Sequence, residues 1–129
     1  MPKTALELTP EERKKYRLAE VLRARKNKKD RKVDLLRQEA WQVAGKAAEI
    51  LRRDYGASKV AIFGSLVHEG AFGLWSDIDV ATWGVRPEEF YSAVGAVTGL
   101  SPLFKVDVVD IEECRSTLRE IIEREGIEI

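Results

Sequence analysis

Two aspartates interrupt a run that otherwise has the composition of a buried strand. The run is DIDVATW, residues 77–83, and its carboxylates Asp77 and Asp79 are two residues apart. Side chains two apart on a strand leave the same face of a sheet, so both acids face one way while Ile78 and Val80 face the core. The fold must therefore place something beside this strand that stabilises clustered negative charge.

A third acid and a glycine–serine pair extend this pattern. Asp107 lies in a second apolar segment, LFKVDVVD at 103–110, and Gly64-Ser65 ends a short apolar segment that begins at residue 59. If these strands lie side by side, the three carboxylates converge. Mg²⁺ prefers oxygen ligands and takes others from phosphates, while glycine lets a phosphate approach the backbone and a helix start offers it N–H groups. We predict metal ions at one end of a site and a polyphosphate at the other, as in two-metal nucleotidyl transfer.

The rest of the chain predicts an α/β protein in which strands and helices alternate after residue 56. Gly56 fits the left-handed position that ends a helix. Periodicity, turn signals and caps predict strands at 59–64, 77–83, 103–110 and 127–129, helices at 87–99 and 111–126, and a helical turn at 66–70.

The N-terminal part is predicted to be helical. TPEE at 9–12 has the form of a capping box, and neither Pro nor Gly follows it until Gly45. The polar run KNKKD at 26–30 predicts that the first helix weakens there. We divide the chain into a basic helical N-terminal extension, 1–34, and a compact domain, 35–129.

Charge is unevenly distributed along a chain whose net charge is zero. Residues 1–59 carry 17 Lys/Arg against 9 Asp/Glu, and residues 60–129 carry 5 against 13. The basic half is suited to nucleic acid or to an acidic protein, or it is simply solvated. No aromatic residue occurs in RARKNKKDRK at 23–32, which disfavours stacking on single-stranded bases.

Composition excludes several classes of protein. The single cysteine, Cys114, rules out an internal disulfide and a cysteine zinc site. No apolar run approaches the roughly 20 residues of a membrane span, and no secretory signal is visible at the N-terminus. We expect a cytoplasmic protein without a membrane partner.

The chain resembles the minimal nucleotidyltransferases of the DNA polymerase β superfamily, whose signature is h-G-[GS]-x(9–13)-D-h-[DE]-h. FGS at 63–65, eleven intervening residues and DIDV at 77–80 match every element, and Asp107 matches the third family carboxylate. The resemblance covers about residues 35–129. It implies a polymerase-β-like α+β fold, in which helices pack on a small mixed sheet.

The resemblance also implies an activity, which is transfer of a nucleoside monophosphate, AMP from ATP, to an acceptor hydroxyl. It implies that Asp77 and Asp79 bind two Mg²⁺ ions with the NTP, that Asp107 binds one of them and helps activate the hydroxyl, and that Gly64 and Ser65 hold the triphosphate. Many such short proteins are antitoxins of HEPN-domain toxins, so a HEPN-type toxin is the expected partner and a protein hydroxyl the expected acceptor.

Two other interpretations remain open. Asp77 and Asp79 alone would also suit a strand end with solvated acids. The same fold would also serve as a non-catalytic binding module that neutralises a partner protein or grips nucleic acid through its basic N-terminal helices. Three acids on one face favour chemistry, because a binding scaffold has no use for them.

Overall fold

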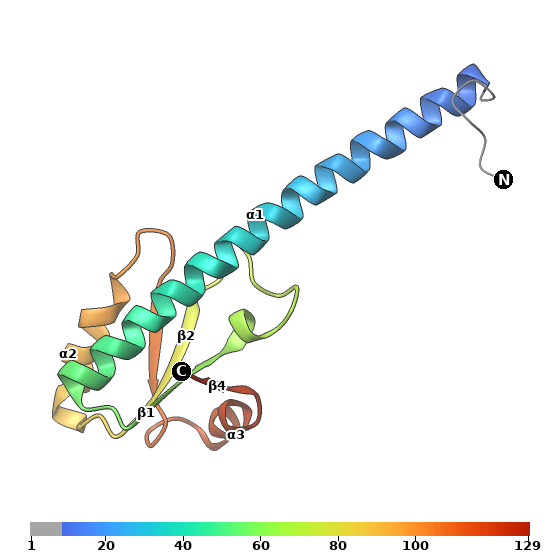
Figure 1. Ribbon diagram of the computed structural model, residues 1–129. Coiled ribbons are helices and arrows are strands. Elements are labelled where there is room, and N and C mark those ends of the chain that lie inside the picture. Colours follow the sequence, from blue (N-terminus) through green and yellow to red (C-terminus); the bar gives the residue numbers. More distant parts are fainter. Residues whose placement is uncertain (1–8) are drawn as a thin grey trace. The chain divides into compact units, whose positions relative to one another are not determined.

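The computed structural model describes residues 9–129, apart from the side chain of Lys29, and the chain divides into two units between Asp34 and Leu35 (Figure 1). One helix, α1 (Pro10–Tyr55), contributes residues to both units. The assignment of separate functions to 1–34 and 35–129 stays a prediction.

Helix α1 has the predicted ends but not the predicted interruption. The Glu12 N–H donates to Thr9 Oγ1 and the Thr9 N–H to Glu12 Oε2, both at 3.2 Å, which confirms the capping box. Gly56 has φ +71° and donates its N–H to the Arg52 carbonyl, which confirms the left-handed cap. The predicted weakening at 26–30 is wrong, because α1 runs through it. Lys and Arg are good helix formers, and no Pro or Gly breaks the hydrogen-bond ladder there.

Residues 35–129 are built on one four-stranded mixed sheet, which confirms the predicted fold class. Its strands are β1 (Lys59–Phe63), β2 (Ile78–Trp83), β3 (Val106–Asp110) and β4 (Ile127–Glu128). Their order is β3-β2-β1-β4; β1 is antiparallel to β2 and β4, and β2 is parallel to β3. Strand β3 starts later than predicted, because the chain before it turns Phe104 into the core against Phe72, with ring centroids 5.5 Å apart.

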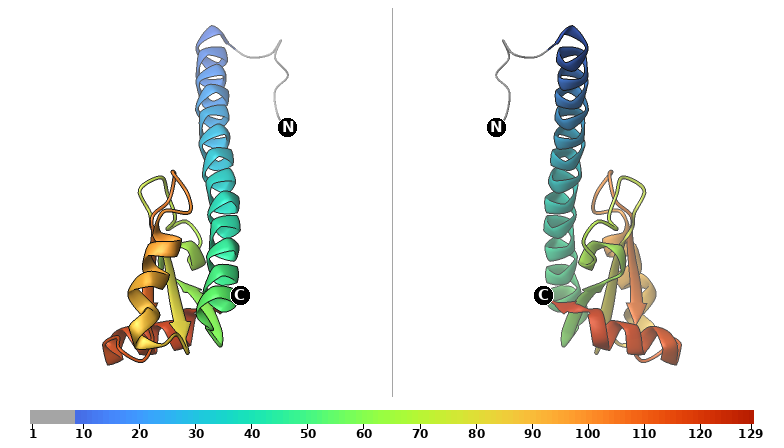
Figure 2. Two further views of the ribbon diagram at one scale, coloured as in Figure 1. Left: turned by 90° about the vertical axis from the view of Figure 1, so that its left-hand side faces the viewer. Right: turned by 90° about the vertical axis from the view of Figure 1, so that its right-hand side faces the viewer.

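Helices cover both faces of this sheet, which Figure 2 shows from two sides. On one face, α1 and the predicted helix α2 (Pro87–Thr98) pack on the main core, which includes Leu51, Ile62, Val80 and Val97. On the other face, α3 (Ser116–Glu125) contributes Ile122 to a smaller cluster with three buried residues, Phe63, Ala81 and Ile111.

Helix α3 is shorter than the predicted helix at 111–126. The residues before it form a turn, in which the N–H groups of Glu113 and Cys114 donate to the Asp110 carbonyl. Asp110 Oδ1 also accepts the Glu112 N–H at 3.0 Å. This local hydrogen bonding competes with the helix and delays its start. Within residues 9–129, no helix is long and apolar enough to cross a membrane.

Candidate active site

Asp79 lies at the centre of what we call the acidic cluster, which consists of Asp77, Asp79 and Asp107. Across β2 it is paired with Phe63 of β1 on one side and with Asp107 of β3 on the other. Because side chains alternate along a strand, Asp79 and Asp107 leave the sheet on the same face as Ala81, opposite Val80 and the main core. The register therefore places two of the three predicted acids side by side.

The acidic cluster carries electrostatic repulsion. Burial raises the pKa of Asp79 from 3.8 to about 6, and the charges of Asp107 and then Asp77 act in the same direction. Asp77 is exposed, one residue before β2, and still contributes to this shift. Asp77 and Asp107 thus both lie close enough to repel Asp79, and a bound cation would relieve that repulsion.

Gly64 brings the glycine–serine pair against the acidic cluster. A Cβ added to Gly64 would collide with Oδ2 of Asp79, and its φ of +76° is one that L side chains rarely adopt. Gly64 and the half-buried Ser65 open the 3₁₀ helix η1 (Gly64–Val67), so the predicted helical turn begins two residues early. The two halves of the sequence motif, eleven residues apart in the chain, are in contact at this point.

Lys105 is a site residue that sequence reasoning missed. Its Nζ lies 3.2 Å from Oδ1 of Asp107. The two residues are two apart just where β3 begins, so their side chains reach the same face. The i, i+2 spacing in KVD was the available signal. The ammonium group offsets part of the negative charge of the acidic cluster.

The donor set fits a metal that is shared with a substrate better than a metal held by protein alone. Among residues 9–129, no three His, Cys, Asp or Glu side chains are grouped so as to hold an ion by themselves. Mg²⁺ commonly binds through one or two carboxylates and completes its shell with water and phosphate oxygens. The adjacent Asp79 and Asp107, with an open backbone at Gly64, suit that mode of binding.

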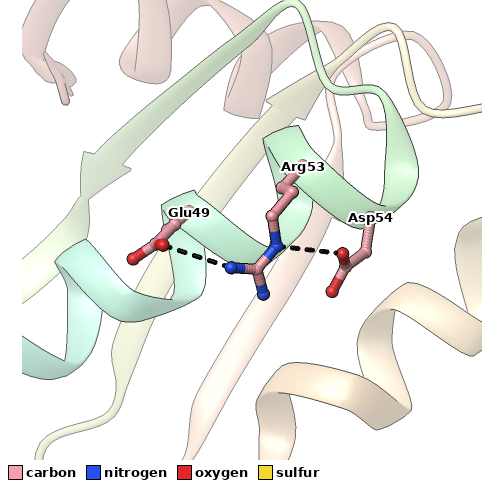
Figure 3. A network of polar contacts seen from close by, with 3 residues as sticks. All are labelled: Glu49, Arg53 and Asp54. Carbon is pink, nitrogen blue, oxygen red and sulfur yellow. Dashed lines mark hydrogen bonds and ion pairs between the residues drawn. The ribbon is translucent and has the colours of Figure 1, made fainter.

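A surface hollow of about 440 Å³ lies elsewhere in this unit, and no member of the acidic cluster lines it. Its wall includes Arg53, whose guanidinium contacts Glu49 at 3.3 Å and Asp54 at 3.1 Å (Figure 3). The hydrogen bond and charge of Asp54, followed by the charge of Glu49, raise the pKa of Arg53 above its usual value. With its charge already matched, this cation is poorly suited to recruit an anion.

Solved structures share this fold. A MntA–HepT toxin–antitoxin complex with two Asp-to-Glu substitutions has a TM-score of 0.55 and 19% identity over 66% of this chain and 70% of that one. A toxin–antitoxin structure with AMP-PNP has a TM-score of 0.53 and 20% identity over 64% and 69%. A candidate minimal nucleotidyltransferase has a TM-score of 0.52 and 28% identity over 75% and 95%.

No family model and no curated protein matches the sequence. The structural likeness nevertheless establishes the architecture. The chain has the minimal nucleotidyltransferase fold, and the resemblance seen in the sequence is confirmed at that level.

Proposed function

We propose that this chain is a Mg²⁺-dependent nucleotidyltransferase that transfers AMP from ATP to a protein hydroxyl, and that it is the antitoxin of a HEPN-type toxin. The contact between Gly64 and the Asp79 carboxylate carries the proposal. It puts a backbone open to phosphates directly beside clustered acids. Similarity to MntA–HepT complexes and to a toxin–antitoxin structure with AMP-PNP supports this choice of partner and nucleotide.

In the proposed reaction, the acceptor oxygen attacks the α-phosphorus of ATP and forms a new P–O bond. The bond from that phosphorus to the bridging oxygen breaks, and pyrophosphate leaves with the electron pair. Asp107, whose Oδ1 lies 3.2 Å from Lys105 Nζ, is the residue that would accept the hydroxyl proton. Gly64 and Ser65 would hold the triphosphate, Asp77 and Asp79 would hold two Mg²⁺ ions, and Asp107 would hold one of them. Bound Mg²⁺ supplies Lewis-acid stabilisation of the attacking and leaving oxygens.

The test is transfer of label from [α-³²P]ATP to a candidate toxin, the product of the neighbouring gene. We expect the toxin to become labelled in Mg²⁺, to stay unlabelled in EDTA, and to lose its toxicity as label accumulates. Phosphoamino acid analysis then identifies the hydroxyl. Absence of label on a toxin that binds this chain would refute the transfer reaction.

A non-catalytic binding module is the second candidate, favoured by the basic composition of residues 10–34, which hold 11 Lys/Arg against 5 Asp/Glu. The two candidates differ in one outcome. If Asp79→Asn still neutralises the toxin in cells as well as the wild type does, binding alone is the function. If neutralisation is lost while the complex still forms, transfer is required.

A further inference from the structure

Residues 10–34 of α1 carry a polarised charge distribution. They contain 11 Lys/Arg against 5 Asp/Glu. Placed at 100° per residue, four acids fall within a sector of about 80°. These acids are Glu12, Glu20, Asp30 and Asp34. The fifth, Glu11, lies in the first turn, where a carboxylate favours the helix N-terminus.

The opposite side of this segment is what we call the basic face. Nine described Lys and Arg residues project over the remaining arc, and all nine are exposed. The basic face consists of Arg13, Lys14, Lys15, Arg17, Arg25, Lys26, Lys28, Arg31 and Lys32. Glu11 projects into the same arc but precedes Arg13, the first of these cations, so no acid lies between the cations of the basic face.

The basic face has no internal counter-charge. Among the described residues, no ion pair involves any of its nine side chains, whereas Arg53, Arg86 and Lys105 of the other unit all have carboxylate partners. Its charges extend over about 29 Å of helix axis. An array of this length, kept free of acids, is suited to an extended polyanion.

We propose that the basic face binds the phosphate backbone of double-stranded nucleic acid, independently of sequence. Its length is close to one turn of a duplex, about 34 Å, in which each strand offers a phosphate about every 3.4 Å. The cations form two groups, at 13–17 and at 25–32, and both can lie along the phosphates of one turn of a duplex.

Other polyanions fit the basic face less well. The exposed aromatic residue of this segment, Tyr16, projects among the acids and not on the basic face, where single-stranded bases would stack. Its exposed large apolar residues, Leu18, Val21 and Leu22, are confined to about one turn. A protein interface needs an apolar core, and a membrane-surface helix needs an apolar stripe along its length. Neither is present on this part of the described chain.

The test measures binding of the full chain to a fluorescent 25-base-pair duplex of arbitrary sequence by anisotropy at increasing NaCl. We expect log affinity to fall linearly with log salt, with a slope of about −4.5 to −6.3 if five to seven phosphates are neutralised. A scrambled duplex of equal length should bind equally well. Each neutralised cation of the basic face should reduce the slope by about 0.9.

The decisive variants are a matched pair on the same helix. Lys26→Gln removes a cation of the basic face, and Arg23→Gln removes an equally exposed cation that projects among the acids. We expect the slope to change for Lys26→Gln and to stay unchanged for Arg23→Gln. The triple variant Arg25→Gln/Lys26→Gln/Lys28→Gln should weaken binding at low salt by at least tenfold, with circular dichroism confirming unchanged helicity.

Four outcomes would overturn the proposal. These are equal effects of Lys26→Gln and Arg23→Gln, tighter binding to single strands than to the duplex, tighter binding to phosphatidylserine vesicles than to the duplex, and salt-sensitive self-association that the triple variant abolishes. The last would mean that the acidic half of a second copy covers the basic face. None of these measurements depends on nucleotidyl transfer.

Discussion

The two units of this chain place charge by different means. In residues 35–129, polar and charged groups are brought together by tertiary structure: β2–β3 pairing puts Asp79 beside Asp107, and His68 lies 3.0 Å from Glu125 of α3. In residues 10–34, charge is arranged by helical periodicity alone, and the basic face stays exposed and unpaired among the described residues. A single substitution should therefore have a large effect in residues 35–129 and a small, additive effect in residues 10–34.

The largest expected effect is the loss of transfer in Asp79→Asn. Removing this carboxylate removes a predicted metal ligand, and we expect labelling of the toxin to fall by about 10³-fold, equivalent to about 4 kcal/mol. Duplex binding should be unchanged, since the basic face is untouched.

Asp110→Asn is the matched control, an aspartate at the end of β3 whose side chain accepts a local N–H. An amide oxygen keeps that hydrogen bond, so its transfer rate should stay within twofold of wild type. If both variants lose activity equally, general damage to the sheet explains the loss better than metal binding does.

Gly64→Ala should have the next largest effect. Its Cβ would collide with Asp79 Oδ2, and the left-handed backbone adds strain of about 1–2 kcal/mol. Displacing the carboxylate should reduce transfer by about 10²-fold. Gly70→Ala introduces the same strain at φ +79° with nothing within 4 Å, so it should lower stability without affecting transfer. If Gly70→Ala loses transfer and Gly64→Ala does not, the backbone that meets the phosphates lies near Gly70 and not at Gly64.

A smaller effect concerns pH. Because the pKa of Asp79 is raised from 3.8 to about 6, the folded protein binds this proton more tightly than the unfolded chain does. Below about pH 4, Asp79 is largely protonated in both the folded and the unfolded protein, so its ionisation does not lower the stability of the fold. The loss of stability develops between about pH 4 and 6 and is complete above pH 6.

Asp79→Asn should therefore be more stable than wild type at pH 8 by about 1–2 kcal/mol after allowance for partial exposure, and equally stable at pH 4. Urea unfolding in EDTA at both values measures this difference. A difference in unfolding free energy that is the same at pH 4 and pH 8 would mean that packing, and not charge, causes the difference in stability between wild type and variant. Adding Mg²⁺ should stabilise the wild type and not the variant.

The smallest effect on the domain is expected from deletion of residues 1–30. The removed side chains that the structure describes are almost all exposed, so the unfolding free energy should change by less than about 1 kcal/mol and Mg·ATP binding should persist. Duplex binding should be lost.

Leu51→Ala, at a fully buried core position, is the control. It should lower the unfolding free energy by about 2–5 kcal/mol, which shows that the assay detects damage to the core. A truncated chain that fails to fold would mean that residues 1–30 are needed for the stability of residues 35–129, and would contradict the prediction.

Local signals in the sequence were sufficient for much of this structure. Short segments rich in apolar and β-branched residues located β1 and β2, Pro87 located the start of α2, and the cap residues located both ends of α1. These features depend on a few neighbouring residues. The spacing of Asp77 and Asp79 also predicted a shared face, because strand geometry fixes it.

The features that were missed depend on competition or on distant contacts. The polar run at 26–30 lacks an apolar stripe, yet nothing in it stops a helix that has already formed, since propagation is easier than nucleation. Asp110 delays α3 through a hydrogen bond to its own turn. The spacing of Lys105 and Asp107 was a signal for their contact, but only the pairing of β3 with β2 places that contact beside Asp79, and single-strand patterns do not show which strands pair.

The ladder between β1 and β2 has a consequence for insertions. Its register pairs Lys59 with Trp83 at one end and Phe63 with Asp79 at the other. The position of Gly64 against Asp79 is therefore set by the pairing of the strands, and not by the loop between them. One residue added within β2 would turn Asp79 toward the core, because side chains alternate, and one added within β1 would shift the residues that pair with it. Residues added beside Trp75, which is 93% exposed in that loop, would leave the pairing intact. This loop is therefore where the protein can acquire a new recognition peptide without rebuilding its chemistry.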